Sequence, residues 1–302
     1  MTSTRHLGLD LGGTNLKWAV LEYDGAVPLV LDQGQQPSAV EAGPDHVIDR
    51  FVTIADDAAR RWSSISTIGI GVPGRYDPAT GSARFLVNLP GGWRGVAIAE
   101  PVQRATGLPV VLINDARAFG LAELRLGAGR GARSMVGLTL GTGVGGVIAI
   151  DGRIHHGHDG TAGEIGHQTI DPDGPPCNCG GRGCLEAFAR ADRIAAACGT
   201  ASVEEAVAAA RSGVPAATRG LAEVGRMLGI GIANAITLIT PDRVVIGGGV
   251  AAAGDLLLDP IRAELTERVR MTALDRVALM LAGLGVWAGA IGAAAHGAES
   301  AT

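Results

Sequence analysis

The stretch that decides how this chain folds runs from residue 164 to residue 186. It reads Glu164-Ile-Gly-His167, then a Pro/Gly-rich run, then Cys177-Asn-Cys179-Gly-Gly-Arg-Gly-Cys184-Leu-Glu186. One histidine and three cysteines lie close together in it, and tetrahedral zinc prefers imidazole and thiolate ligands. We therefore expect His167, Cys177, Cys179 and Cys184 to bind one zinc ion.

This ligand set is closed, since four protein side chains complete a tetrahedral shell. Closed sets are typical of structural zinc, whereas a catalytic zinc ion keeps one position for water. Two carboxylates, Glu164 and Glu186, flank the ligands, and a shared ion would bring both of them to one place. The alternative is that the cysteines are redox-active or merely buried, although only Cys198 lies elsewhere in the chain.

Composition narrows the class of protein. The chain has 302 residues, of which 47% are hydrophobic and 3% aromatic, enough for one large or two medium domains with aliphatic cores. A net charge of −5 without a basic patch argues against a nucleic-acid partner. We find no N-terminal apolar signal region and no apolar run near 20 residues, so we expect no membrane partner. Cysteines that suit a metal better than disulfides indicate a cytoplasmic protein.

Three glycine-rich turns follow strand-like runs, at residues 12–14, 141–143 and 247–249. Strand-like runs lie on both sides of the first two turns, so these are hairpins. A Walker loop or a dinucleotide fingerprint would continue into a helix instead. Backbone N–H groups in glycine turns can still approach phosphate oxygens. Two such hairpins in one chain suggest two related halves.

Two aspartates stand at the ends of strand-like runs, where α/β sheets usually bind ligands. Asp10 is placed to hold a magnesium ion through water, or it belongs to an ordinary hairpin turn. Asp115 follows a buried run at 110–113 and precedes a helix expected over 116–126. Its carboxylate can accept a proton from a substrate hydroxyl, or it merely caps that helix.

Five motifs occur in order along nearly the whole chain: Asp10-Leu-Gly-Gly-Thr-Asn-Leu-Lys17, Asn114-Asp115-Ala116, Leu140-Gly-Thr-Gly143, Glu164-Ile-Gly-His167 and Cys177-x-Cys179-Gly-x₃-Cys184-Leu-Glu186. Together they resemble the ROK family (repressor, open reading frame, kinase), most closely its bacterial glucokinases. The resemblance implies an α/β fold of two actin/hexokinase-like (ribonuclease H-like) domains around a central cleft, and a homodimer. The small N-terminal domain would comprise residues 1–113 and 287–302, and the large domain residues 114–286, with the zinc-binding segment 164–186.

The resemblance also implies a reaction, the phosphorylation of a hexose, above all glucose at its 6-hydroxyl, by Mg-ATP. Asp115 would be the general base for the accepting hydroxyl, and His167 would bind zinc through one ring nitrogen and the sugar through the other. The other implied sugar-binding positions are Gly74, Asn88, Asn114, Glu164 and Glu186. The implied positions for ATP and Mg²⁺ are Asp10, Gly12, Gly13, Thr14, Gly141, Thr142 and Gly143, with Lys17 in support and Gly247, Gly248 and Gly249 near the adenosine.

Departures from the family pattern leave alternatives. Arg117 stands where many relatives have Asn, which affects the surroundings of the base. The pair Gly74-Arg75 resembles N-acetylmannosamine kinases of the family, so an N-acetylhexosamine (N-acetylmannosamine or N-acetylglucosamine) or another polyol is the alternative substrate, and polyphosphate an alternative donor. A sugar-sensing regulator of the family would carry a helix-turn-helix before the first hairpin; this hairpin begins close to Met1, which favours the kinase.

Overall fold

The computed structural model describes residues 3–25, 27–86 and 89–301. The chain divides into two compact units, Met1–Arg130 with Leu284–Thr302, and Gly131–Gly283. The domain boundaries expected from the sequence lay after residues 113 and 286. Residues 114–130 belong to the first unit because the helix that follows Asn114 packs against the last helix of the chain.

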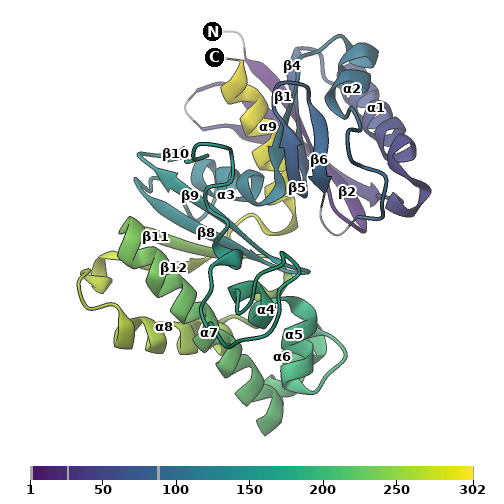
Figure 1. Ribbon diagram of the computed structural model, residues 1–302. Helices are drawn as coiled ribbons and strands as arrows, with labels where there is room; N and C mark the ends of the chain where they lie inside the picture. Colours follow the sequence, from purple (N-terminus) through teal and green to yellow (C-terminus); the bar gives the residue numbers. More distant parts are fainter. Residues whose placement is uncertain (1–2, 26, 87–88, 302) are drawn as a thin grey trace. The chain divides into compact units, whose positions relative to one another are not determined.

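The first unit is built on a five-stranded sheet (Figure 1). Its antiparallel part is a meander of three strands, and two further strands run parallel to the first of them. The inner strands are buried almost throughout, as parallel strands covered on both faces are. In sheet order the strands are β3 (Leu29–Pro37), β2 (Asn15–Tyr23), β1 (Thr4–Leu11), β4 (Ile65–Val72) and β7 (Val110–Asn114).

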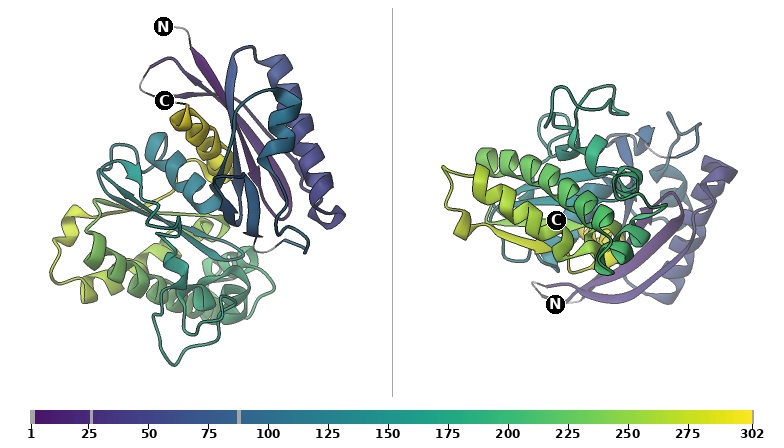
Figure 2. Two further views of the ribbon diagram at one scale, coloured as in Figure 1. Left: turned by 45° about the horizontal axis from the view of Figure 1, so that its top comes forward. Right: turned by 90° about the horizontal axis from the view of Figure 1, so that it is seen from below.

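Four helices and a small hairpin complete this unit. Proline at the first position of α1 suits a helix start, and Val47, Phe51 and Ala55 form its buried face. The last helix packs directly on the sheet (Figure 2), because Gly8 and Gly69 leave no side chain between strand and helix. The elements are α1 (Pro44–Arg61), α2 (Ala99–Thr106), α3 (Asp115–Arg125), α9 (Ala288–Ser300), and the hairpin of β5 (Gly74–Asp77) and β6 (Ser82–Leu86).

The second unit repeats the topology of the first. Its sheet again places the first strand in the middle, with an antiparallel meander on one side and two parallel strands on the other. In sheet order the strands are β10 (Arg153–Ile154), β9 (Val144–Ile150), β8 (Met135–Leu140), β11 (Arg243–Gly247) and β12 (Ala278–Leu281). The repeat agrees with the two related halves that the paired hairpins suggested.

The long helix α7 corrects one expectation from the sequence. Its length and composition would suit a membrane span, with a mean hydropathy of 1.3 over the most apolar window, although we had found no apolar run near 20 residues. Half of that window is buried inside the protein, where α7 is the central helix of the second core. The helices of this unit are α4 (Leu185–Ala189), α5 (Ala191–Cys198), α6 (Val203–Arg211), α7 (Pro215–Ile239) and α8 (Asp255–Arg268).

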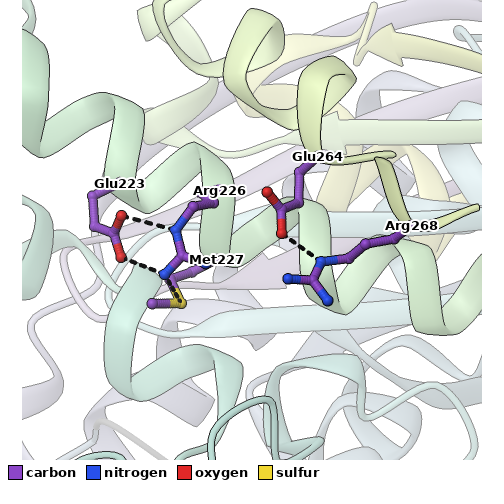
Figure 3. A network of polar contacts seen from close by, with 5 residues as sticks. All are labelled: Glu223, Arg226, Met227, Glu264 and Arg268. Carbon is purple, nitrogen blue, oxygen red and sulfur yellow. Dashed lines mark hydrogen bonds and ion pairs between the residues drawn. The ribbon is translucent and has the colours of Figure 1, made fainter. Parts of the chain in front are cut away.

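Helices α7 and α8 pack closely because α7 offers glycines at their crossing. A side chain at Gly225 would overlap Pro260, and one at Gly229 would lie 2.6 Å from the Cβ of Glu264. Each helix also carries its own ion pair (Figure 3). Arg226 donates to both carboxylate oxygens of Glu223, at 2.9 and 2.8 Å, and Arg268 donates to the largely buried Glu264.

Candidate active site

The first unit gathers its predicted site residues at one edge of its sheet. Strands β1, β4 and β7 are parallel, so their carboxyl ends lie at the same edge. Asp10 pairs with Gly71 of β4, and Val72 pairs with Asn114 of β7. Asp115 follows directly at the start of α3. This edge is where open α/β sheets bind their ligands.

Asn114 caps helix α3 and orients the carboxylate of Asp115. Its Oδ1 accepts the N–H of Arg117 at 3.2 Å, and its Nδ2 donates to the carbonyl of Gly74 at 3.2 Å. The same Nδ2 donates to Oδ1 of Asp115 at 3.0 Å, an atom that also accepts the N–H of Ala116 at 2.8 Å. The helix cap is therefore Asn114, so Asp115 is not needed for that purpose.

Asp10 is a largely buried carboxylate between two glycines and a lysine. Its Oδ2 lies 3.9 Å from Nζ of Lys17, its partner across the first hairpin. Burial raises the pKa of Asp10, and the charge of Lys17 lowers it. A side chain at Gly289 would overlap this carboxylate, and Gly289 lies in the first turn of α9. The positive end of that helix dipole therefore also favours the charged form of Asp10.

Ser38 holds the first glycine turn in place, a role that the sequence did not reveal. Its hydroxyl donates to the carbonyl of Gly13 at 3.0 Å, and its N–H donates to the carbonyl of Thr14 at 2.9 Å. The N–H of Gly12 donates to the carbonyl of Asn15 at 3.0 Å. These three hydrogen bonds hold the first glycine turn in its shape.

The family resemblance implies that this turn binds ATP, so Ser38→Ala is expected to raise the KM for ATP about fivefold with a small change in the KM for sugar. The lost hydrogen bond contributes about 1 kcal/mol, and a tenfold change in an equilibrium constant corresponds to about 1.4 kcal/mol. Steady-state kinetics with each substrate varied in turn measures both constants. Ser66→Ala is the matched control, because the Ser66 hydroxyl donates to the carbonyl of Arg5 at the opposite end of β1. Equal effects of the two substitutions would contradict the assignment.

In the second unit the two other glycine turns lie beside each other. They follow the parallel strands β8 and β11, so they share one edge of the sheet. Gly248 has a φ of +85°, and a side chain there would overlap the backbone of Leu140. Gly141 and Gly249 instead face open space where a side chain would be. A ligand can therefore approach the backbone closely at both turns.

Glu186 links the second turn to the cysteine segment. It lies in the first turn of α4, and its Oε2 accepts the N–H of Val144 at 2.9 Å. Its Oε1 lies 3.9 Å from Sγ of Cys177. A Cβ at Gly143 would lie 2.5 Å from Oε2. Gly143 therefore makes room for this carboxylate, a purpose that the pattern of glycines alone did not indicate.

The four predicted metal ligands converge in the second unit. The ligand atoms of His167, Cys177, Cys179 and Cys184 all lie within 4.8 Å of one another. The Sγ atoms of Cys179 and Cys184 are 3.7 Å apart, and Nδ1 of His167 lies 3.8 Å from Sγ of Cys177. Thiolates on a tetrahedral zinc ion with Zn–S bonds of about 2.3 Å would be separated by about 3.8 Å. The donor set and its spacing therefore fit zinc.

Two of the three thiols have raised pKa values, so they hold their protons more tightly than a free cysteine does. Burial, followed by the two neighbouring thiols, raises the pKa of Cys184 to about 12. Burial also raises the pKa of Cys177, whereas the N–H of Gly181 lowers the pKa of Cys179. Three thiolates so close together repel one another, and a bound divalent cation removes that cost.

Backbone contacts place the cysteine segment and the preceding Glu164. The N–H of Cys177 donates to the carbonyl of Gly181 at 2.9 Å. A short 3₁₀ helix, η2 (Ile165–His167), follows Glu164, and its Gly166 packs so closely on Val144 that a side chain would overlap the strand. Both Glu164 and His167 are exposed, so their side chains are accessible to a ligand.

A pocket of about 570 Å³ lies in the first unit next to Gly74. The buried indole Nε1 of Trp93 has no hydrogen-bond partner in the part of the chain that the structure describes. The pocket is lined by Arg75, Arg84, Phe85, Leu86, Leu89, Pro90, Gly91, Gly92, Trp93 and Arg94.

Two further residues singled out from the sequence are Asn88 and Arg117. Asn88, a predicted sugar-binding residue, lies outside the described residues. Arg117 is buried near Tyr76, whose pKa is raised by burial and lowered by the charge of Arg117.

Comparison with known proteins identifies the family. The model of the ROK family matches residues 6–299. The chain belongs to the ROK family. A curated relative, the glucokinase of Halalkalibacterium halodurans, is 35% identical over 97% of this chain and 94% of its own length. The family suggested by the five sequence motifs is thereby confirmed.

Solved structures of ROK proteins share the fold. The ROK hexokinase of Thermus thermophilus is 35% identical, with a TM-score of 0.83 over 99% of both chains. A ROK family glucokinase from Streptomyces griseus, solved in complex with glucose and AMPPNP, is 30% identical, with a TM-score of 0.82 over 98% of this chain and 99% of that chain. These likenesses confirm the expected α/β fold with actin/hexokinase-like domains.

Proposed function

We propose that this ROK protein is an ATP-dependent hexose kinase, with glucose phosphorylated at its 6-hydroxyl as the first candidate reaction. The observation that carries the proposal is the orientation of Asp115 by Asn114 at the ligand-binding edge of the first sheet. The near-full-length similarity to a glucokinase supports the same reaction.

Asp115 accepts the proton of the sugar hydroxyl as that oxygen attacks the γ-phosphate of ATP. Phosphoryl transfer depends on alignment and charge neutralisation more than on covalent chemistry, so one well-placed base is sufficient. Mg²⁺, when bound, supplies positive charge to the phosphates. Asp10 would hold that ion, and the charge of Lys17 favours the ionised form by lowering the pKa of Asp10.

The sugar is held through its other hydroxyl groups. A carboxylate accepts several hydrogen bonds and donates none, which suits a polyhydroxylated ligand. We assign this role to Glu164 and Glu186, together with Asn114. Gly74 and Asn88 border the same ligand in this proposal.

The glycine turns of both units bind the nucleotide in this proposal. Backbone N–H groups in such turns can approach phosphate oxygens closely. Residues 12–14 and 141–143 take the phosphates. Residues 247–249 lie near the adenosine.

We assign a structural zinc ion to the cysteine segment. When bound, it supplies no chemistry beyond joining the loops that carry its ligands. Because Nδ1 of His167 faces the sulfur of Cys177, its Nε2 is left to hydrogen-bond a sugar hydroxyl. A homodimer and a cytoplasmic location remain predictions.

The test of the function is ATP-dependent ADP formation with glucose, mannose, N-acetylglucosamine, N-acetylmannosamine and inositol. We expect turnover with glucose, and the same panel with polyphosphate tests the alternative donor. Preference for an N-acetylhexosamine would keep the kinase and correct the substrate. No turnover with any sugar, in protein shown to be folded and zinc-loaded, would exclude the kinase and favour a sugar-binding regulator.

A further inference from the structure

Glu123 is a buried acid that the proposed reaction does not use. It lies near the end of α3, and its side chain has no solvent exposure (0%). The chain passes between the two units twice, between Arg130 and Gly131 and between Gly283 and Leu284. Residues next to both crossings contact the Glu123 carboxylate.

One carboxylate holds both crossing segments. Oε2 of Glu123 accepts the N–H of Ala128 at 2.8 Å, on the segment that leaves the first unit. Oε1 accepts the N–H of Leu284 at 2.9 Å, on the segment that returns to it. A side chain at Gly127 would overlap the carboxylate, so this close approach requires glycine.

A carboxylate suits this contact because it offers two acceptor oxygens to two backbone donors. A buried charge is costly unless hydrogen bonds satisfy it, and an ionised carboxylate accepts bonds at both oxygens without donating. Buried charges often add little to stability compared with apolar residues and can instead specify one arrangement. A carboxylate between two backbone N–H groups fixes the distance between the two segments that bear them.

Each of the two segments adjoins a helix of the site: the leaving segment follows α3, and the returning segment precedes α9. Helix α3 begins at Asp115. The returning segment passes through a short 3₁₀ helix, η5 (Gly285–Trp287), into α9, whose Gly289 contacts Asp10. The helices α3 and α9 cross so closely at Gly292 that a side chain there would overlap the backbone of Ala118. The Glu123 carboxylate is therefore connected to Asp115 through α3 and to Asp10 through the start of α9.

We propose that Glu123 is a positioning residue for phosphoryl transfer. It fixes where both crossing segments attach to the first unit, and so holds α3, which carries Asp115, and the start of α9, which contacts Asp10, in one arrangement. The inference rests on the proposed kinase function, because phosphoryl transfer needs the base Asp115 and the carboxylate of Asp10 aligned on the reacting groups.

Glu123→Gln tests the inference with little change in volume. The amide oxygen can accept one N–H, but its NH₂ group then faces the other backbone donor. We expect hydrogen exchange at residues 127–131 and 283–287 to become at least tenfold faster without ligand, while β1 and β4 exchange as before. We also expect kcat to fall about 10- to 100-fold, since small misplacements can cost a factor of 100, with ATP affinity changed less than twofold.

Glu299→Gln is the matched control, because Glu299 is another acid that joins α3 to α9, through its pair with Arg125. Gly127→Ala is the second variant in case Glu123→Gln does not fold, and it should give a weaker form of the same effects. Unchanged hydrogen exchange, or an unchanged kcat per mole of folded protein, would overturn the inference. Absence of turnover in the wild-type protein would instead refute the kinase function.

Discussion

Asp115→Ala is expected to lower kcat by a factor of about 10² to 10⁴, the usual contribution of a general base. The KM for sugar should change little, because a group that acts mainly in the transition state adds little to substrate binding. Fold and stability should persist, since Asn114 rather than Asp115 caps α3. Turnover is measured by ADP formation, and sugar binding by calorimetry.

Two further variants sharpen this test. Asp115→Asn keeps the shape of the side chain and can still accept the N–H of Ala116 through its amide oxygen, but it cannot take a proton. It should be nearly as inactive as the alanine variant. Asp57→Ala, on the exposed face of α1, is the control and should retain wild-type turnover. Wild-type kcat in Asp115→Ala would exclude Asp115 as the base.

Removal of zinc should weaken sugar binding before it affects nucleotide binding. The predicted ligands lie in a segment with little regular secondary structure, so the ion supplies much of its order. Structural zinc contributes about 10 kcal/mol or more to the folding of small zinc domains, and loss of that contribution should disorder residues 164–186. We expect chelation to weaken sugar affinity at least tenfold and to leave ATP affinity within about twofold.

Elemental analysis, calorimetry and hydrogen exchange of the chelated protein measure these effects. Cys184→Ser should reproduce them without a chelator, because it removes one ligand from the set. Cys198→Ala is the control, since Cys198 is buried elsewhere, with its Sγ donating to the carbonyl of Ala217 at 3.5 Å. Active protein shown to contain no zinc would refute the structural role of the metal.

Local patterns predicted much of the fold. The apolar spacing of residues 135–140 predicts a strand and that of residues 203–211 predicts a helix, and both elements form with these bounds. One boundary differs for a physical reason. The residue pattern predicts a helix over 259–272, which corresponds to α8. It begins at Asp255 instead, because packing of Pro260 on Gly225 of α7 compensates for a proline inside the helix.

The convergence of the four predicted metal ligands was predictable for the same reason. These ligands are close in sequence, and their types and spacing carry the chemical information. The glycine turns were found by the same local reasoning, although it did not distinguish glycines that face open space from those that make room for a neighbour. Gly141 is of the first kind and Gly143 of the second.

Residue types and short spacings were thus enough to place the chain in the ROK family and to find two glycine hairpins, while the metal segment and the aspartate base stay predictions. The sequence patterns did not reveal Ser38, which acts on a turn 25 residues away, or Glu123, which accepts an N–H 161 residues away. A buried hydrogen bond depends on which backbone groups folding brings within reach. That information lies in the packing of α3, α9 and the sheet, so only the tertiary structure assigns those two residues.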